Sequence, residues 1–324
     1  MAGEQQGMHV TMVCARFPPL IGGTEAHVYE LGRRLIERGH RVDVVTTVAD
    51  AARAGTSNEE GVEVHRVPTR FSRSDLHFAP TLRSTVERVG GDLIHVQGYH
   101  TFVAPMAMAA ADRIGRPYVV TFHSGGHSSR FRRAVRPIQQ RILRSQLERA
   151  GALIGVSAFE SAFFTRRLGL ADDRIETVPN GVAPEFVDVG RNAMRRRSGS
   201  PLVVSFGRLE EYKGHHKVIR AFARRHQALA GARLRLVGAG SQREVLATLA
   251  EDLGISDRVE FVAVPYGDRA GLAAELGAAD VVVLMSSYES QGISGYEALA
   301  TGARLIVADG SALTELGSFP GVEV

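Results

Sequence analysis

The stretch YESQGISGYEA, residues 288–298, follows closely on the apolar run DVVVLM at residues 280–285. A short apolar run of this kind is typical of a strand that is buried on both faces of a parallel sheet. The glycine-containing segment after it predicts a loop that opens a helix continuing through Ala300. This order of strand, loop and helix indicates an α/β fold in which the end of a strand delivers side chains to the start of a helix.

Two carboxylates, Glu289 and Glu297, lie in this stretch with seven residues between them. At 3.6 residues per turn, this separation leaves the two side chains only about 80° from full register, so both can border one cleft. Carboxylates accept hydrogen bonds from sugar and ribose hydroxyls, while free N–H groups at a helix start attract phosphate. The pattern favours a nucleotide-sugar site, although two glutamates at this spacing are also common on a solvated helix face.

Two basic side chains follow another expected strand, PLVVSF at residues 201–206. The segment SFGRLEEYKG, residues 205–214, places Arg208 and Lys213 above the carboxyl end of this strand, where ligands bind in open α/β sheets. Lysine is rare in this chain, because Lys213 and Lys217 are the only two among 39 basic residues. Arg208 and Lys213 therefore predict a site for an anionic group.

Strands alternate with helices twice along the chain. In the first half we expect an amphipathic helix at residues 25–38 and strands at residues 10–15, 41–47, 62–67, 93–97, 118–122, 152–156 and 175–178. In the second half we expect strands at residues 202–206, 233–237, 259–262, 280–285 and 304–307. Strands that alternate with helices form parallel sheets. The sequence therefore predicts an α/β protein of two Rossmann-like domains that face a cleft.

A polar segment separates the two halves. RNAMRRRSGS, residues 191–200, combines charge with serine and glycine and predicts a flexible linker. We expect an N-terminal domain at residues 1–185, a linker at 186–200 and a C-terminal domain at 201–324. A length of 324 residues suits two domains, each able to bury a substantial core.

The first expected strand lacks the GxGxxG dinucleotide fingerprint and is followed instead by RFPPLIGGTE, residues 16–25. Gly22 and Gly23 precede a helix that we expect to begin near Thr24, a residue type that commonly caps helices. Glycines at this point let the backbone approach an anionic group, and the helix start supplies N–H donors. A plain loop that uses glycine only for its backbone conformation is the alternative.

These motifs, in this order, resemble the family-4 glycosyltransferases, retaining enzymes of the GT-B fold. Two further segments carry the resemblance: VVTFH at residues 119–123, which ends a strand in His123, and VPNGV at residues 178–182, near the hinge. In the C-terminal half, GRLEEYKG, RLRLVGAG, RVEFVAVP and the glutamate pair arrive at the expected intervals. The resemblance covers almost the whole chain, and its strength lies in seven motifs in register rather than in any one of them.

The resemblance implies a hexosyltransferase that moves a hexose-like sugar from a nucleoside diphosphate sugar to an unidentified acceptor. It assigns the acceptor to the N-terminal domain, the donor to the C-terminal domain, and catalytic roles to His123, Arg208, Lys213 and Glu289. The donor is expected to contact Gly22, Gly23, Arg208, Lys213, Glu289, Gly292, Ile293, Ser294 and Glu297.

Within this set, Arg208 and Lys213 would neutralise the diphosphate, Glu289 would hold hydroxyls of the donor sugar, and Glu297 those of the ribose. His123 would contact the donor sugar or the transfer centre. The family generally needs no bound metal, and the histidines are scattered, so we expect neither a metal site nor a cofactor apart from the donor substrate.

Composition suits a cytoplasmic protein. A single cysteine, Cys14, excludes an intramolecular disulfide, the N-terminus lacks a secretory signal pattern, and no window approaches the roughly 18 apolar residues of a membrane span. The segment at residues 128–150, SSRFRRAVRPIQQRILRSQLERA, spaces apolar residues at helical intervals among arginines. We expect it to pack on its own domain, with peripheral contact at the inner face of the membrane as the alternative.

Two other classes of protein stay open. A nucleotide-sugar epimerase or a sugar phosphorylase on the same fold would share the paired domains, although a phosphorylase would normally show a cofactor lysine that we do not find. A net charge of +4 and a pI near 9.5 also allow a non-catalytic polyanion-binding protein. No recognised nucleic-acid module is present in the sequence, so we expect no nucleic-acid partner.

Two features depart from the family pattern. Gln291 stands before Gly292 where an aromatic residue is usual, which predicts a more polar sugar pocket. After SALTEL, residues 311–316, the sequence ends at Val324, where family members normally continue with another strand and closing helices. We therefore expect a truncated C-terminal domain that binds nucleotide but transfers sugar weakly. The motifs specify neither the base, the sugar, the acceptor nor the oligomeric state.

Overall fold

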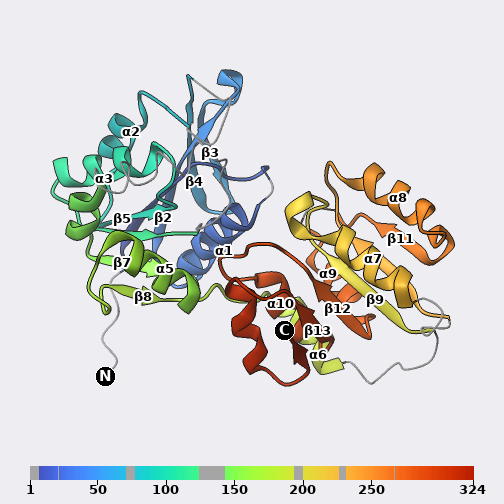
Figure 1. Cartoon of the computed structure of the whole chain (residues 1–324). Helices are drawn as coiled ribbons and strands as arrows, with labels where there is room; N and C mark the ends of the chain where they lie inside the picture. The colour runs from blue at the N-terminus through green and yellow to red at the C-terminus, as the bar shows by residue number, and fades with distance from the viewer. Residues whose placement is uncertain are drawn as a thin grey trace. The chain divides into compact units, whose positions relative to one another are not determined.

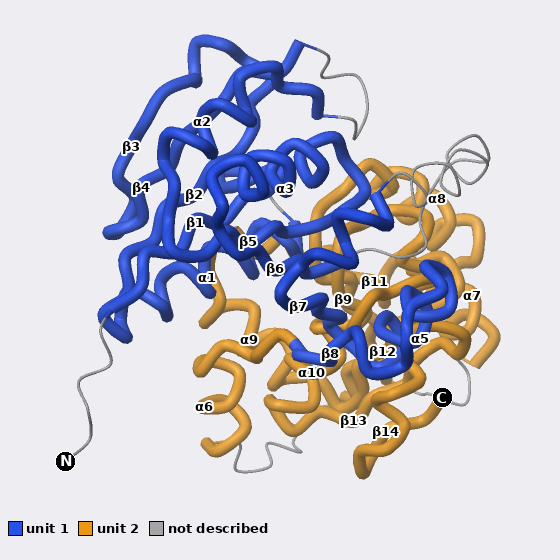
Figure 2. The backbone as a smooth tube through the Cα atoms, turned by 90° about the vertical axis from the view of Figure 1, so that its left-hand side faces the viewer, with its two compact units in different colours: residues 1–179 blue, residues 180–324 orange. Residues whose placement is uncertain are grey.

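The computed structural model of the chain describes residues 7–20, 22–70, 77–123, 143–192, 200–225, 231–265 and 267–324. The chain divides into two compact units, unit 1 (Met1–Pro179) and unit 2 (Asn180–Val324) (Figure 2). Each unit is built on one sheet with helices packed on both of its faces (Figure 1). The predicted class, α/β with two Rossmann-like domains, is confirmed.

Unit 1 contains an eight-stranded sheet in the order β3-β4-β2-β1-β5-β6-β7-β8. All neighbouring strands pair in parallel except β3, which is antiparallel to β4. The predicted strands are confirmed; β3 was missed because its sequence, GTSNE, is polar and exposed at the sheet edge. The strands are β1 (His9–Cys14), β2 (Arg41–Val48), β3 (Gly55–Glu59), β4 (Val62–Pro68), β5 (Leu93–Gln97), β6 (Tyr118–Thr121), β7 (Ala152–Gly155) and β8 (Ile175–Thr177).

Side chains on the central strands of unit 1 alternate between two cores, as the pleat of a strand requires. Val13 and Val45 lie in the core covered by α2, α3 and α5, whereas Met12 and Val44 lie in the core covered by α1. Both faces are therefore apolar, which is why these strands read as continuous apolar runs. In the described part of unit 1, the helices are α1 (Gly23–Glu37), η1 (Ala51–Arg53), α2 (Leu82–Val89), α3 (Val103–Arg113) and α5 (Ala158–Leu168).

Unit 2 contains a six-stranded parallel sheet in the order β11-β10-β9-β12-β13-β14. This is the strand order of a Rossmann fold, and it reverses between β9 and β12. The predicted strands are confirmed, and the two-residue strand β14 was not predicted. The strands are β9 (Leu202–Phe206), β10 (Arg233–Val237), β11 (Val259–Val262), β12 (Val281–Leu284), β13 (Arg304–Val307) and β14 (Val322–Glu323).

Two groups of helices cover the sheet of unit 2. Helices α7 and α8 pack on one core, and α6, α9 and α10 with η4 pack on the other. The helix that was predicted to continue through Ala300 is α10, which begins at Ile293. The helices are α6 (Pro184–Asn192), α7 (His215–Arg225), α8 (Arg243–Asp252), α9 (Arg269–Gly277), α10 (Ile293–Ala300), η2 (Glu211–Lys213), η3 (Ser256–Arg258) and η4 (Ala312–Ser318).

The boundary between the units differs from the predicted one. Unit 2 begins at Asn180, whereas the sequence placed the N-terminal domain at residues 1–185 and a linker at 186–200. Part of that segment is helix α6, whose Phe186 is buried in the core shared with α9 and α10. Gly190 lies so close to the Ala300 carbonyl that an added Cβ would be 2.0 Å from its oxygen. Polar residues on the outer face of α6 made this segment resemble a linker in the sequence. Residues 193–199 of the predicted linker lie outside the described residues.

The basic segment at residues 128–150 falls mostly outside the described residues, which resume at Leu143. In the described part, Leu143, Leu147 and Ala150 are buried in the core of unit 1. This end of the segment therefore packs on its own unit. Among the described residues, no helix is long and apolar enough to cross a membrane.

Candidate functional site

Lys213 and Glu289 meet at the carboxyl edge of the sheet in unit 2. Lys213 ends η2 in the loop after β9, and Glu289 lies in the loop after β12. The Lys213 ammonium is 2.5 Å from Glu289 Oε1, and the two side chains are 13% and 20% exposed. Because β9 and β12 flank the point where the strand order reverses, this pair stands where open α/β sheets bind ligands. Tertiary structure thus joins two predicted residues that are 76 positions apart.

Backbone contacts hold these two loops together. The Ser287 N–H donates to the Tyr212 carbonyl at 2.8 Å. Gly214, at φ +75°, packs so tightly that an added Cβ would be 2.1 Å from the carbonyl oxygen of Met285. Only glycine suits both this backbone conformation and this close approach. The position of Lys213 relative to Glu289 is therefore fixed by the backbone as well as by the ion pair.

Arg208, the second predicted cation of this loop, is exposed to solvent and packs against Tyr212. Its guanidinium donates to the Tyr212 hydroxyl and lies 5.6 Å from the centroid of the Tyr212 ring. The Lys213 ammonium lies 5.5 Å from the same centroid. Both cations thus contact the ring of Tyr212, and Arg208 is also held by its hydroxyl. Tyr212 was not predicted from the sequence, because an aromatic residue in a loop gives no signal of its own.

A buried histidine, His215, is hydrogen-bonded to the backbone of the same loop. His215 Nε2 donates to the Arg208 carbonyl at 3.1 Å, so Nδ1 accepts from the Ser205 hydroxyl at 2.8 Å. Burial lowers the pKa of His215 to about 4, against a weaker raising effect of the bond to the Arg208 carbonyl. The imidazole is therefore neutral at pH 7 and connects β9 to the backbone of the cationic loop. This residue, too, was not selected from the sequence.

Glu297 lies on α10, two turns beyond the loop that carries Glu289. Burial raises the pKa of Glu297 to about 7, while the charges of Arg269 and Lys213 act to lower it. The first turn of α10 follows Gly292, which adopts φ +75°, and begins with Ile293 and Ser294. N–H groups in a first helical turn have no intrahelical acceptor and can bind an anion. The loop and α10 thus carry an ion-paired carboxylate, a carboxyl group with a raised pKa and a helix start.

Gln291 has a structural contact that the sequence did not predict. Its amide oxygen accepts from the Asn180 N–H at 3.0 Å, and its amide nitrogen donates to the Asn180 carbonyl at 2.9 Å. The side chain is only 4% exposed. The Gln291 amide therefore links the first residue of unit 2 to the loop after β12. This contact does not support the expectation that Gln291 makes the sugar pocket more polar.

In unit 1, the glycine pair lies at the start of α1. Gly22 precedes the helix, and Gly23 is its first residue; the expectation that Thr24 caps the helix was wrong, because the chain enters it one residue earlier without a side-chain cap. The Glu25 carboxylate, paired with Arg16 at 2.8 Å, fills the space beside Gly22, where a Cβ would be 2.1 Å from Glu25 Oε2. No atom lies within 4 Å of a Cβ built on Gly23, so its backbone has open space beside it.

His123 stands at the end of the strand that was predicted for it, within a cluster of polar side chains. It has a positive φ of 56°, and its Nε2 donates to Gln97 Oε1 at 2.6 Å. The His27 ring packs against it, with 4.7 Å between ring centroids. Behind Gln97, His95 Nε2 lies 3.2 Å from the Gln97 amide nitrogen and 2.8 Å from the Thr121 hydroxyl. The bond to Gln97 places the proton of neutral His123 on Nε2, so Nδ1 is an acceptor.

The histidines of this cluster are neutral at pH 7. Burial, reinforced by His27, His95 and His100, holds the pKa of His123 well below its usual range. Burial also lowers the pKa of His27 to about 4 and, with a contribution from His27, that of His95 to about 3. The cluster therefore offers hydrogen bonds rather than positive charge.

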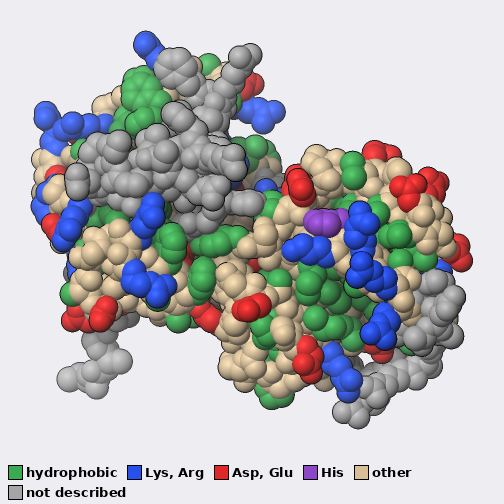
Figure 3. All heavy atoms as spheres, in the orientation of Figure 1, with side chains coloured by type: hydrophobic (Ala, Val, Ile, Leu, Met, Phe, Trp, Pro, Cys, Tyr) green, Lys and Arg blue, Asp and Glu red, His purple; other side chains and the backbone are tan. Residues whose placement is uncertain are grey.

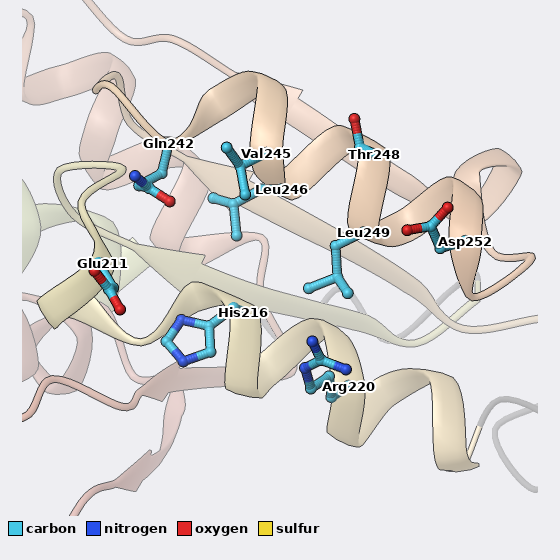
Figure 4. A pocket seen from close by; sticks show the side chains of 9 residues that line it. All are labelled: Glu211, His216, Arg220, Gln242, Val245, Leu246, Thr248, Leu249 and Asp252. Carbon is cyan, nitrogen blue, oxygen red and sulfur yellow. The ribbon is translucent and has the colours of Figure 1, made fainter.

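A hollow on the outside of unit 2 contains none of the predicted site residues. It lies between α7 and α8, and Figure 4 shows polar side chains of α7 opposite mainly apolar side chains of α8. On the face of unit 2 that Figure 3 shows, Lys and Arg side chains border apolar surface. The hollow is lined by Glu211, His216, Arg220, Gln242, Val245, Leu246, Thr248, Leu249 and Asp252.

The sequence analysis predicted no metal site. In the described part of the chain, ligand-type side chains converge at Asp43, Glu63 and His65. These residues lie near the amino ends of β2 and β4, at the opposite edge of the sheet from the loop that follows β1. They are therefore separate from the candidate residues described above.

Two Rossmann-like units, one with a lysine–carboxylate pair at its switch point, are typical of the GT-B class of glycosyltransferases. Residues 21–186 match the family model described as Glycosyltransferase Family 4, and residues 189–316 match the model described as Glycosyl transferases group 1. The chain therefore belongs to the glycosyltransferases that combine these two domains.

Named relatives agree with this assignment. An uncharacterized glycosyltransferase of Methanocaldococcus jannaschii is 28% identical, with 95% of this chain and 82% of the relative covered. A glycogen synthase of Mycobacterium tuberculosis is 29% identical, covering 95% of this chain and 80% of the relative. Among solved structures, the Anabaena protein HepE in complex with UDP and glucose superimposes with a TM-score of 0.71 at 21% identity, covering 95% of this chain and 83% of that one. The structural likeness supports the fold.

Proposed function

We propose that this glycosyltransferase is a retaining enzyme that transfers a hexose-like unit from a nucleoside diphosphate sugar to an acceptor. The observation that carries the proposal is the Lys213–Glu289 pair at the switch point of unit 2, with Arg208 and Glu297 close by in the same unit. UDP and glucose in the Anabaena neighbour support a donor of this chemical class. Retention and the hexose follow from the resemblance to family-4 enzymes.

Negative charge develops on the departing diphosphate as the sugar becomes oxocarbenium-like. Preorganised cations stabilise such charge without reorganising at the moment of reaction. Arg208 can grip phosphate oxygens in a bidentate manner, while Lys213 acts as a point charge. One of the three Lys213 donors is used on Glu289, so two stay available for the diphosphate. With two cations in place, we propose that transfer needs no added divalent metal.

The carboxylates would hold the two sugars of the donor. Glu289 keeps an oxygen available beside its bond to Lys213 and would accept from hydroxyls of the transferred sugar. Glu297 would accept from the ribose hydroxyls. The N–H groups at Gly292, Ile293 and Ser294 would face the diphosphate, because the start of α10 carries the positive end of the helix dipole.

Unit 1 would provide the acceptor side together with part of the donor environment. The open backbone at Gly23, next to Gly22, would let an anionic group approach the start of α1. His123, being neutral, would contact the donor sugar through a hydrogen bond from or to its imidazole. Charge neutralisation would then rest on Arg208 and Lys213 in unit 2.

A calorimetric panel of nucleoside diphosphates and their sugars, titrated into the full chain, tests the proposal. We expect binding restricted to one base, and turnover of the matching sugar donor with retained anomeric configuration. Glu297→Gln should weaken the ribonucleotide more than its 2'-deoxy form, because the lost acceptor matters only when the hydroxyl is present. Glu244→Gln, at an exposed position on α8, is the matched control. Absence of binding to every nucleotide of the panel would reject the proposal.

A further inference from the structure

Four ligand-type side chains share one face of the sheet in unit 1. Asp43 on β2 pairs in register with Thr11 on β1 and with Glu63 on β4. His9 and His65 lie two residues along β1 and β4 from these partners, so the period of two places all of them on one face. Because these positions are near the amino ends of three parallel strands, the cluster stands at the edge of this sheet opposite the loops after β1 and β6, which carry Gly22 and His123.

The carboxylate of Asp43 is the centre of this cluster. Its side chain is 0% exposed, yet its oxygens contact both imidazoles: His65 Nε2 lies 3.1 Å from Oδ1, and His9 Nε2 is bonded to Oδ2. Glu63 Oε1 lies 3.9 Å from His65 Nε2. The ligand atoms of Asp43, Glu63 and His65 all lie within 4.8 Å of one another.

These separations suit a common metal ion. With bonds of about 2.0–2.1 Å to nitrogen and oxygen, ligand atoms at the corners of a tetrahedron are about 3.3 Å apart. The observed distances of 3.1 and 3.9 Å from His65 Nε2 lie on either side of that value. Small side-chain rotations would therefore place the ligand atoms of Asp43, Glu63 and His65 around one ion. His9 Nε2, which is bonded to Asp43 Oδ2, lies outside that group of three and would join as a fourth ligand once its ring turns toward the ion.

A further contact fixes the ring that would bind the ion. His65 Nδ1 is 3.1 Å from the Thr56 hydroxyl, on the neighbouring strand β3. Without an ion, Nε2–H donates to Asp43 and Nδ1 lies against the Thr56 hydroxyl. With an ion bound, the hydroxyl would instead accept from Nδ1–H and leave the Nε2 lone pair for the metal. Metal-binding histidines are commonly oriented in this way through their second nitrogen.

In the absence of an ion, the Arg41 guanidinium pairs with the carboxylates of Asp43 and Glu63 and balances part of their charge. Its Nε lies 3.3 Å from Asp43 Oδ2, and its Nη2 lies 3.6 Å from Glu63 Oε2. The Arg41 side chain is 65% exposed, so it can turn into solvent when a cation enters. A divalent ion would then neutralise both carboxylates, while the imidazoles of His9 and His65 complete the set.

We propose that His9, Asp43, Glu63 and His65 bind one divalent first-row transition metal, with Zn²⁺ as the class that fits best. Imidazole ligands favour Zn²⁺, Co²⁺ or Ni²⁺ over Mg²⁺ and Ca²⁺, which prefer an all-oxygen set. The ion would cross-link β1, β2 and β4 and so stabilise the edge of the sheet. This structural role is independent of the proposed sugar transfer, because the ligands contact none of the residues assigned to it.

Metal titration of the chelator-treated full chain tests the site. We expect one equivalent of Zn²⁺ to bind and to raise the midpoint of thermal unfolding, since an ion that binds only the folded state stabilises it by mass action. Co²⁺ should give the intense visible absorption of a tetrahedral centre. In the double variant His9→Gln/His65→Gln, both signals should disappear, while the glutamine amides can still donate to Asp43 and keep the metal-free fold.

Two further variants make the result decisive. The control His40→Gln/His216→Gln, which removes two histidines outside the cluster, should bind Zn²⁺ and Co²⁺ as the parent does. Glu63→Gln alters a side chain that is 44% exposed and should weaken Co²⁺ binding about tenfold or more with an unchanged metal-free unfolding midpoint. Absence of stoichiometric binding in the parent, or binding that persists in both cluster variants, would show a hydrogen-bonded cluster only and overturn the proposal.

Discussion

Lys213 is the residue on which the proposed diphosphate contact depends most directly. Its ammonium is held by Glu289 and by the ring of Tyr212, so little side-chain freedom is lost when a phosphate binds. Replacing it with alanine should weaken nucleoside diphosphate binding by about 1.5–3 kcal/mol, the scale of a hydrogen bond to a charged group. Isothermal titration calorimetry on the folded variant measures this loss.

The other lysine of the chain provides a matched control. Lys217 is exposed on α7, so Lys217→Ala changes the net charge by the same amount without touching Glu289. Nucleotide affinity should stay at the parent value in this control. An equal loss of affinity in both variants would show a general charge effect rather than a contact at Lys213.

Glu297 should make nucleotide binding depend on pH. Its pKa is raised from 4.5 to about 7, so the folded protein holds a proton between these values that the unfolded chain has released. The contribution of this group to stability therefore falls as pH rises from about 4.5 to 7 and is lost above that range. A ribose hydroxyl donating to the carboxylate favours its ionised form, so binding should release about half a proton per ligand at pH 7.

Calorimetry in buffers of different ionisation enthalpy measures this proton release directly. Affinity should rise with pH through the region around pH 7, because less work is then needed to ionise Glu297. Glu297→Gln should abolish both the release and this slope. Proton release that persists unchanged in the variant would assign the titration to another group.

The charged residues of the site could be predicted from the sequence, whereas the residues that hold them in place could not. Arg208 and Lys213 are each adjacent to a glycine, and Glu289 lies three residues before Gly292. All three follow apolar runs, and this local pattern can be read directly from the sequence. Tyr212 and His215 act through a ring face and through a bond to a carbonyl, and both depend on how the loop folds back. The pairing of β5 with β6 brings Gln97 within hydrogen-bond distance of His123. This pairing is part of the tertiary structure and cannot be read from the sequence.

The loops after β9 and β12 form the element that aligns the proposed catalytic charges. Gly214→Ala should destabilise the protein by about 2–5 kcal/mol, because alanine at positive φ adds backbone strain and its Cβ would overlap the Met285 carbonyl. Chemical denaturation followed by a probe in unit 2 measures the effect.

Gly302→Ala separates the two causes. Gly302 has φ +82°, but no atom lies within 4 Å of a Cβ built on it, so only the backbone strain of about 1 kcal/mol applies. Nucleotide binding should survive in this control and weaken in Gly214→Ala. Similar costs for the two variants would mean that the loop relaxes away from Met285.

Among the secondary structure elements, the buried parallel strands were the most predictable, because helices cover both their faces and their residues are continuously apolar. Strand β3 escaped prediction because GTSNE has no apolar alternation and pairs on only one side. Helix α6 was assigned mostly to a linker because its apolar residues, Phe186, Val187 and Val189, form only a short pattern that runs into the polar stretch beginning at Arg191. Only the contact with α9 and α10 shows where it belongs.

At the scale of the whole molecule, α6 should respond as part of unit 2. Phe186 is 1% exposed in the core of that unit, so Phe186→Ala should cost about 3–5 kcal/mol. Hydrogen exchange should show lost amide protection in α9 and α10, with the sheet of unit 1 unchanged. Phe319→Ala, at a position that is 43% exposed in unit 2, is the control and should have a smaller effect. Loss of protection in unit 1 alone would return α6 to the first domain.

The clip between Asn180 and Gln291 joins residues that are 111 positions apart, and α6 lies just after its first member. A ribosome releases the chain from its N-terminus, so every strand of unit 1 has emerged before α6 does. Helix α6, by contrast, emerges before any strand of unit 2 and must wait for α9 and α10 to be synthesised. Throughout that interval the ring of Phe186 has no cover from its final neighbours, which makes this short helix a natural contact for chaperones on the nascent chain.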